Sequence, residues 1–393
     1  MKHFLFILIL FFTILTFFKP SGFDALGMNS INTFFNISRI VVTIIISIVY
    51  FSGKKYHSKL LKYLFFYFCV SFFSTYIHGL KLSIVIILSG SAIGFAMLTE
   101  IMIKKNLRLF LKVLLYIYFI LIVFNLFWMI SVVGFTVNIE EVYGEDSLQN
   151  MVVCFLSNAN MSASFFIPGM LIATLNLFMS SKYNLISWIL LISTFLSGLI
   201  LWSATSLVGE SIILLFSICI LFNIEQIFIR YVKPIVLLFL SLFISVGVTF
   251  FKIQNLFEFL IVDILHKDLT MTGRTTVWNY GFKAFEKSPI IGLGFGNKSV
   301  MTCDNCYAQI LGDNGMLGFI AFFMLIYFSY KNLFRGKKTK VKYLFTLVAA
   351  LLFLMFIAES WVNFWGLYIL LILFYNIESI DKLIYNSNKK YLA

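Results

Sequence analysis

The chain has 393 residues but little charge, because Asp, Glu, Lys and Arg together make up only 12% of it. Soluble domains carry about 25% charged and about 45–50% apolar residues, whereas this chain is 61% hydrophobic. Its composition excludes most soluble enzymes, disordered proteins and collagens, and its five cysteines exclude a disulfide-rich scaffold. What it has instead is apolar residues in unbroken runs, which are typical of membrane-spanning helices.

Twelve apolar runs follow one another and predict about twelve transmembrane helices. Their approximate bounds are 4–18, 37–51, 60–78, 81–102, 109–135, 151–179, 184–202, 204–223, 234–251, 315–330, 343–358 and 361–377. Cationic loops are retained in the cytoplasm, and 21 of the 30 lysines and arginines fall on the side that holds both termini. The sequence therefore predicts an all-α polytopic membrane protein with cytoplasmic N- and C-termini, and its net charge of +13 reflects this topology and not nucleic-acid binding.

One loop is long enough to form a small subdomain outside the membrane, and loops of this length are often functional. We expect residues 1–251 to form transmembrane helices 1–9 and residues 252–313 to form a large extracytoplasmic loop with interfacial helices. Within the loop, residues 252–267 have the pattern of a helix at the membrane surface. Residues 314–393 then form helices 10–12 and a cytoplasmic tail.

A short helix is expected in this loop, because Trp278, Phe282 and Phe285 recur at helical spacing and Pro289 bars its continuation. Arg274 then lies at the N-terminus of that helix. Free N–H groups beside a guanidinium form a natural anion site, since arginine binds phosphate with two parallel hydrogen bonds. The alternative is an arginine that caps the helix or pairs with a nearby carboxylate, for which Glu286 and Asp268 are the candidates.

Two other motifs in the loop carry weaker signals. The glycines of 292–296 do not fit a nucleotide-binding motif, because Asn297 stands where the third glycine belongs and no strand precedes it. They predict a tight turn that brings the backbone close to another element. Cys303 and Cys306 have no second pair with which to bind zinc, and either free thiols or a disulfide fits their spacing. Asp304 and Asn305 between them are either turn and capping residues or polar groups of a site.

Four ionisable residues lie in or beside the predicted spans, where charge is costly and often functional. They are Arg39, His78, Glu210 and Glu359, and all four lie toward the extracytoplasmic side. Their distribution predicts a polar cavity that opens outward. Arg39, His78 and Glu359 are near span ends and also fit side chains that extend to the interface, whereas Glu210 lies deeper.

Several segments resemble the superfamily of O-antigen ligases and Wzy-type polysaccharide polymerases. Gly273, Arg274 and Trp278, followed by 288–294 (SPIIGLG), resemble its "GR…W…P-apolar-apolar-G-x-G" signature. Asp304 and Asn305, with 306–318, resemble its "HN-x-x-L-x-x-L-x-x-x-G-x-x-G" element. Weaker matches are 158–163 (NANMSA), similar to "N-P-N-x-x-A", and 203–206 (SATS), similar to a Ser/Thr-rich hairpin.

The resemblance implies a glycosyltransferase that acts at the outer face of the bacterial cytoplasmic (inner) membrane. Its donor and acceptor would be glycans linked to undecaprenyl pyrophosphate, and the polymerases transfer the growing chain onto a new lipid-linked repeat. Arg274 would bind pyrophosphate, with Arg39 as a second cation, and Asp304, Glu210 or Glu359 would serve as base. Gly273, Trp278, Asn305, Glu359 and His78 would bind substrate.

The resemblance also implies no cofactor, no essential metal and no nucleic acid, with the lipid bilayer, a chain-length regulator and a flippase as partners. Two departures favour a polymerase over a ligase. Asp304 stands where the ligases usually carry histidine, and no arginine follows the Ser/Thr hairpin between Leu201 and Ser217. The alternatives are a ligase of the same fold and a lipid-linked oligosaccharide flippase or transporter, for which the expected internal repeat is not evident.

Overall fold

The computed structural model describes residues 2–20, 23, 28–53, 58–131, 136–137, 151–152, 154–156, 162–201, 203–231, 233–258, 274–297, 300, 303–336 and 339–392. This part of the chain is helical apart from one short strand pair. The α-helices are α1 (Lys2–Leu15), α3 (Asn29–Ser52), α4 (Lys59–Ile77), α5 (Ser83–Ser131), α7 (Ala163–Met179), α8 (Leu185–Leu201), α9 (Ala204–Leu221), α10 (Glu225–Tyr231), α11 (Pro234–Phe251), α12 (Arg274–Lys287), α13 (Cys306–Tyr330), α14 (Lys340–Ala358), α15 (Trp365–Tyr375) and α16 (Ile377–Leu392). Short 3-10 helices are η1 (Ile253–Phe257), η3 (Lys331–Phe334) and η4 (Trp361–Asn363), and strand β1 (Thr136–Val137) pairs with β2 (Met151–Val152) in antiparallel register.

The predicted helical class is confirmed, but the count of twelve spans is not. Among the described residues, five helices are long and apolar enough to cross a membrane, or six if a pair bent by 119° (Thr205–Leu221 with Glu225–Tyr231) counts as one span. The other apolar helices have only 10–17 residues. At about 1.5 Å per residue they reach at most about 25 Å, which is short of a hydrocarbon core of about 30 Å.

Three boundaries differ from the apolar runs, each for a local reason. Runs 81–102 and 109–135 are two halves of α5, which breaks at Asn106, where the side chain accepts a hydrogen bond from the Leu109 N–H. Run 151–179 contains β2 before α7 begins at Ala163. Helix α13 begins at Cys306, before run 315–330, and is interrupted at Gly315, where that run begins.

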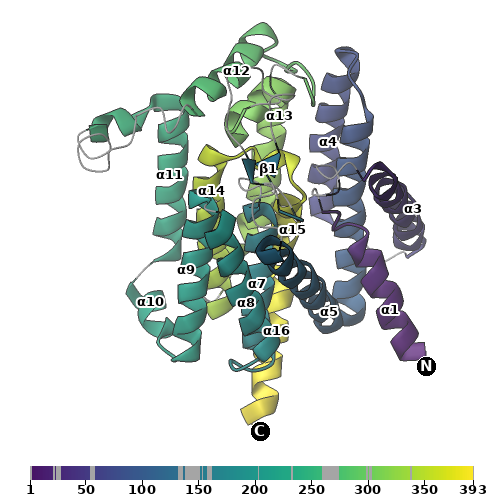
Figure 1. Ribbon diagram of the computed structural model, residues 1–393, viewed down its shortest axis with the longest axis vertical. Coiled ribbons are helices and arrows are strands. Elements are labelled where there is room, and N and C mark those ends of the chain that lie inside the picture. Colours follow the sequence, from purple (N-terminus) through teal and green to yellow (C-terminus); the bar gives the residue numbers. More distant parts are fainter. Residues whose placement is uncertain are drawn as a thin grey trace.

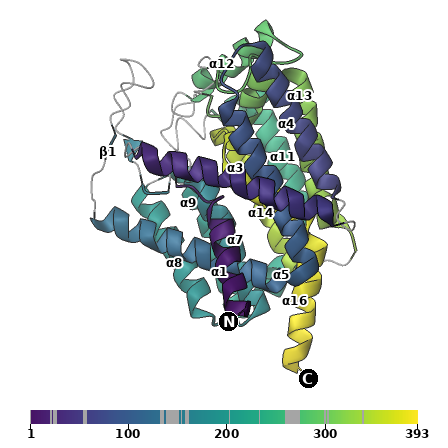
Figure 2. The same ribbon diagram turned by 90° about the vertical axis from the view of Figure 1, so that its right-hand side faces the viewer.

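Helices α4, α11, α13 and α14 lie side by side, and α12 lies across one end of them (Figure 1). Both termini lie at the opposite end, in this view and in the view turned by 90° (Figure 2). Helix α3 lies on the outside at a steep angle to α4. The fold therefore places α12, which belongs to the predicted extracytoplasmic loop, away from the termini.

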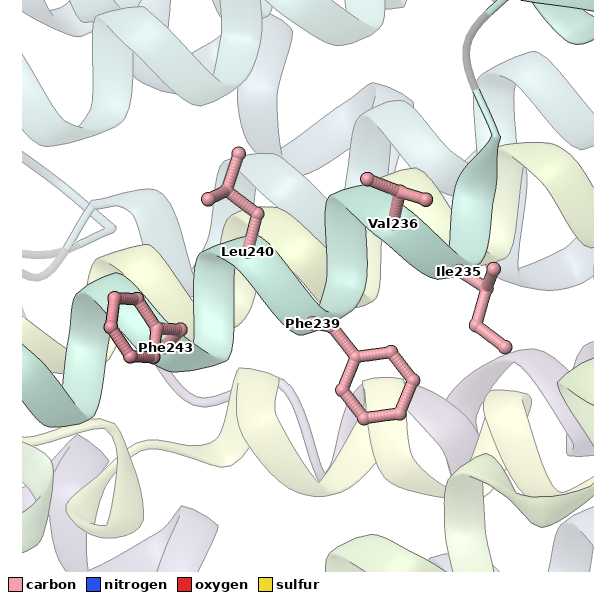
Figure 3. Close-up of a pocket in the computed structure, with 5 residues that line it drawn as sticks. All are labelled: Ile235, Val236, Phe239, Leu240 and Phe243. Carbon is pink, nitrogen blue, oxygen red and sulfur yellow. The ribbon is translucent and has the colours of Figure 1, made fainter.

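Apolar side chains cover much of the outer surface as well as the core. On α11, Ile235, Val236, Phe239, Leu240 and Phe243 point away from the helix around a shallow depression (Figure 3). Phe239 is 63% exposed and Phe243 68% exposed. A surface of this kind suits lipid and not water, which makes the fold compatible with a multi-pass membrane protein.

The expected tight turn at the glycines of 292–296 is confirmed, and it joins the chain after α12 to a break in α13. Gly292 has a φ of +71°, and Gly315 interrupts α13 with a φ of +60°. The N–H groups of Leu293 and Gly294 donate to the carbonyls of Gly312 and Asp313 at 2.8 and 2.9 Å. These bonds satisfy carbonyl groups that the break in the helix leaves free.

Replacing Gly292 with alanine should destabilise this junction by more than about 1 kcal/mol, because both the backbone angle and the available space exclude a Cβ. A Cβ there would lie 2.3 Å from the backbone of Asp313. The matched control is Gly79→Ala, which has a φ of +64° but nothing within 4 Å of the added Cβ. Thermal unfolding of the two purified variants should show a larger loss for Gly292→Ala, and equal losses would contradict the steric argument.

Candidate functional site

Five of the nine site residues predicted from the sequence lie together at the end of the bundle covered by α12. They are Arg274 and Trp278 of α12, Asp304 and Asn305 just before α13, and Glu359 just after α14. We call these five residues the Arg274 cluster. They come from three segments that are far apart in sequence, so only the tertiary fold assembles them.

Arg274 is the first residue of α12, as the sequence predicted, and its described partners lie after α14 and do not include Glu286, whereas Asp268 lies outside the described residues. Its Nη1 donates to the carbonyl oxygen of Ala358 and lies 3.5 Å from Oε1 of Glu359. The Arg274 side chain is 24% exposed, whereas that of Glu359 is 4% exposed. The guanidinium is therefore held by two oxygen atoms, and about a quarter of the side chain is exposed.

Asn305 forms hydrogen bonds through both the oxygen and the nitrogen of its side-chain amide. Its Oδ1 accepts hydrogen bonds from the N–H groups of Tyr307 and Ala308 at 3.0 and 3.1 Å, which caps α13. Its Nδ2 donates to the Thr249 hydroxyl at 3.1 Å and to the Ile357 carbonyl at 3.3 Å. One fully buried side chain thus joins α11, α13 and α14.

Trp278 packs the first turn of α12 onto the bundle. It is 2% exposed and contacts a small apolar group that includes Cys303, Ala308 and Ile357. One turn further along, Gly281 lies against Ala308 so closely that a Cβ would lie 2.5 Å from the Ala308 carbonyl oxygen. These contacts fix the orientation of α12 and hence the position of Arg274.

Burial sets the charge state of the cluster. It raises the pKa of Glu359 to about 8, even though Arg274 acts in the opposite direction. Burial also raises the pKa of Asp304 above its usual range, again opposed by Arg274. Because both carboxyl groups favour the neutral form more than a solvated carboxyl does, the positive charge of Arg274 is only partly neutralised at neutral pH.

The other predicted site residues lie elsewhere. Glu210 of α9 is fully buried, accepts a hydrogen bond from the Ser206 hydroxyl and lies against Gly198 of α8. Arg39 donates to the carbonyls of Thr16 and Phe17 at 3.0 Å and thereby joins α3 to the end of α1. His78 ends α4 and contacts the Ser74 carbonyl at 2.9 Å. Gly273 lies outside the described residues, as do residues 259–267 of the predicted surface helix.

Two buried polar residues near the cluster were given no role from the sequence. Gln309 donates from Nε2 to Oδ2 of Asp313 at 2.6 Å, and both side chains are buried in the first half of α13. Four residues separate them, which is the spacing of side chains that contact each other one turn apart on a helix. Ser74 of α4 also donates to the Asp313 carbonyl at 2.7 Å, which ties α4 to this part of α13.

Thiol and metal chemistry find little support among the described residues. Cys303 and Cys306 are free thiols, and burial raises the pKa of Cys303 to about 12, so that its thiol stays protonated at neutral pH. Within the same part of the chain, no group of three or more His, Cys, Asp or Glu side chains could hold a metal ion. The chemistry of the cluster thus depends on one guanidinium, two carboxyl groups and one amide.

No protein-family model matches the chain, and a search of curated proteins finds no match either.

Proposed function

We propose that the protein is a Wzy-type polysaccharide polymerase of a bacterial cytoplasmic membrane. In this proposal the shorter apolar helices also cross the membrane, where the bilayer thins to match them, so that the chain crosses about twelve times with cytoplasmic termini and the Arg274 cluster faces the outside. The enzyme joins undecaprenyl-pyrophosphate-linked repeat units into O-antigen or capsular polysaccharide. The segments that resemble the polymerase superfamily and the excess of cations on the side of the termini support this assignment.

The observation that carries the proposal is the partly exposed side chain of Arg274 beside two carboxyl groups that burial biases toward their neutral forms. A pyrophosphate leaving group gains negative charge as its bond to the sugar breaks, and a fixed cation stabilises that charge most strongly where water is partly excluded. Arginine suits phosphate oxygens because it can offer two parallel N–H groups. Arg274 therefore binds the leaving group.

The two carboxyl groups have different roles because they differ in access. Glu359 is almost fully buried and contacts Arg274, so it positions the guanidinium. Asp304 is only partly buried and can reach an acceptor hydroxyl. In the proposed step the hydroxyl oxygen attacks the anomeric carbon, Asp304 takes the proton, and the bond between that carbon and the pyrophosphate oxygen breaks with its electron pair leaving on undecaprenyl pyrophosphate.

A ligase of the same fold would use the same cluster with lipid A core as acceptor, and a flippase would move the lipid-linked repeat without breaking a bond. Deletion of the gene followed by gel electrophoresis of surface glycan separates the three functions. We expect single repeat units on the cell surface in the deletion strain. Loss of repeat export would indicate a flippase, and long chains retained on undecaprenyl pyrophosphate would indicate a ligase, so either result would overturn the proposal.

A further inference from the structure

A second cavity lies far along the chain from the Arg274 cluster, between α3, α4 and α5. Its volume is about 450 Å³. Both α3 and α4 pack extensively on α5, but α3 and α4 have little contact with each other, so that α5 forms the floor of a groove between them. Ile93 and Met97, one turn apart on α5, line this floor.

The walls of the cavity are apolar, and its mouth carries positive charge. Phe51 of α3 and Phe65 of α4 form the sides and are 74% and 63% exposed. Lys59 and Lys62, in the first turn of α4, also line the cavity and are exposed. Among the described residues, the carboxylate of Glu100 also lies nearby and accepts a hydrogen bond from the Tyr50 hydroxyl at 2.5 Å, but the two ammonium groups outnumber it.

The position of the lysines along the bundle indicates a membrane interface. Tyr63, one residue after Lys62, stacks on Phe328 of α13 with ring centroids 3.8 Å apart. Lys331 at the end of α13 lies over the same Phe328 ring, at 5.6 Å. The first turn of α4 therefore lies at the same level as the end of the long apolar helix α13, beside Lys331.

From this arrangement we propose that the cavity binds one anionic phospholipid, with its phosphate at Lys59 and Lys62 and an acyl chain along Phe51, Phe65, Ile93 and Met97. A free phosphate ion would use the lysines but gain nothing from the apolar floor and walls. A zwitterionic lipid would fill the groove but would bring a cationic group to the two ammonium groups. An anionic lipid satisfies both parts of the cavity.

The test measures lipid binding to the full-length protein in detergent by native mass spectrometry, with phosphatidylglycerol and phosphatidylcholine that carry the same acyl chains. We expect phosphatidylglycerol to bind the wild-type protein at least about tenfold more tightly. The double variant Lys59→Gln/Lys62→Gln should lose about tenfold in this affinity, whereas Lys105→Gln/Lys112→Gln, two exposed lysines of α5 outside the cavity, should lose little. Equal binding of the two lipids, or equal losses in the two double variants, would overturn the proposal.

Two further measurements separate the acyl and anionic parts of the site. Ile93→Trp fills the floor of the groove and should weaken phosphatidylglycerol binding even if the lysine double variant fails to fold. Millimolar inorganic phosphate should leave the bound phosphatidylglycerol in place. Displacement of the lipid by phosphate, or full binding in Ile93→Trp, would show that the apolar groove contributes nothing and would contradict the proposed site.

Discussion

Replacing Arg274 with alanine should lower polymer formation at least about 100-fold, while the amount of protein in the membrane stays near the wild-type level. The size of the loss follows from the role of the guanidinium, which stabilises charge that develops only as the pyrophosphate departs. The fold should tolerate the change because the side chain is 24% exposed and Asn305 holds the neighbouring helices together independently. Glycan electrophoresis and an immunoblot of membranes measure the two quantities.

Two variants serve as controls for this result. Arg274→Lys keeps the charge but loses the two parallel N–H groups, so its activity should fall between those of the wild type and Arg274→Ala. Lys283→Ala removes an exposed cation from the same helix α12 and should leave chain length normal. Normal polymer in Arg274→Ala at wild-type protein level would exclude a role for this residue in catalysis.

The activity should show a bell-shaped pH dependence that originates in the two carboxyl groups of the cluster. Asp304 acts as a base only after it loses its proton, so activity should rise with pH through the raised pKa of Asp304. When Glu359 loses its proton, its negative charge offsets the positive charge of Arg274. The activity should therefore fall above a pH of about 8. Initial rates of purified enzyme across this range give the profile.

Single substitutions assign the two limbs of this profile. Glu359→Gln is neutral at every pH and should keep activity while the alkaline fall disappears. Asp304→Asn cannot accept the proton and should lose about 100-fold or more at every pH. An unchanged alkaline limb in Glu359→Gln, or an Asp304→Asn variant with wild-type rates, would show that the assigned roles are wrong.

Much of the helical fold follows from the sequence because long apolar runs are unambiguous, but their ends are not. The break of α5 at Asn106 falls in the gap between runs 81–102 and 109–135, but the apolar pattern does not show that the two halves join as one bent helix. The apolar run of α13 begins only at residue 315, at the break of the helix, because the first half of α13 contains buried polar residues such as Asp313. Composition alone does not separate membrane-spanning helices from the shorter apolar helices of 10–17 residues, because apolar core helices have the same composition.

The sequence predicted those parts of the site that depend on neighbouring residues. It did not predict the contacts that tertiary packing creates. The position of Arg274 at the start of α12 follows from helical spacing, and Asn305 has the residue type of a helix cap. The contact between Arg274 and Glu359 joins residues far apart in the chain, so no local pattern predicts it. Glu210 carried the strongest signal of a buried charge, yet its described contacts are with Ser206 and the α8 glycine Gly198.

The central claim is that the protein joins lipid-linked repeats and releases undecaprenyl pyrophosphate. The most direct test supplies the purified protein, reconstituted in vesicles, with the undecaprenyl-pyrophosphate-linked repeat and no other substrate. The account predicts a ladder of longer lipid-linked glycans and one released undecaprenyl pyrophosphate for each bond formed, both absent with Arg274→Ala. Repeat units that cross the vesicle membrane without elongation, or that elongate only when a lipid A core is added, would contradict it.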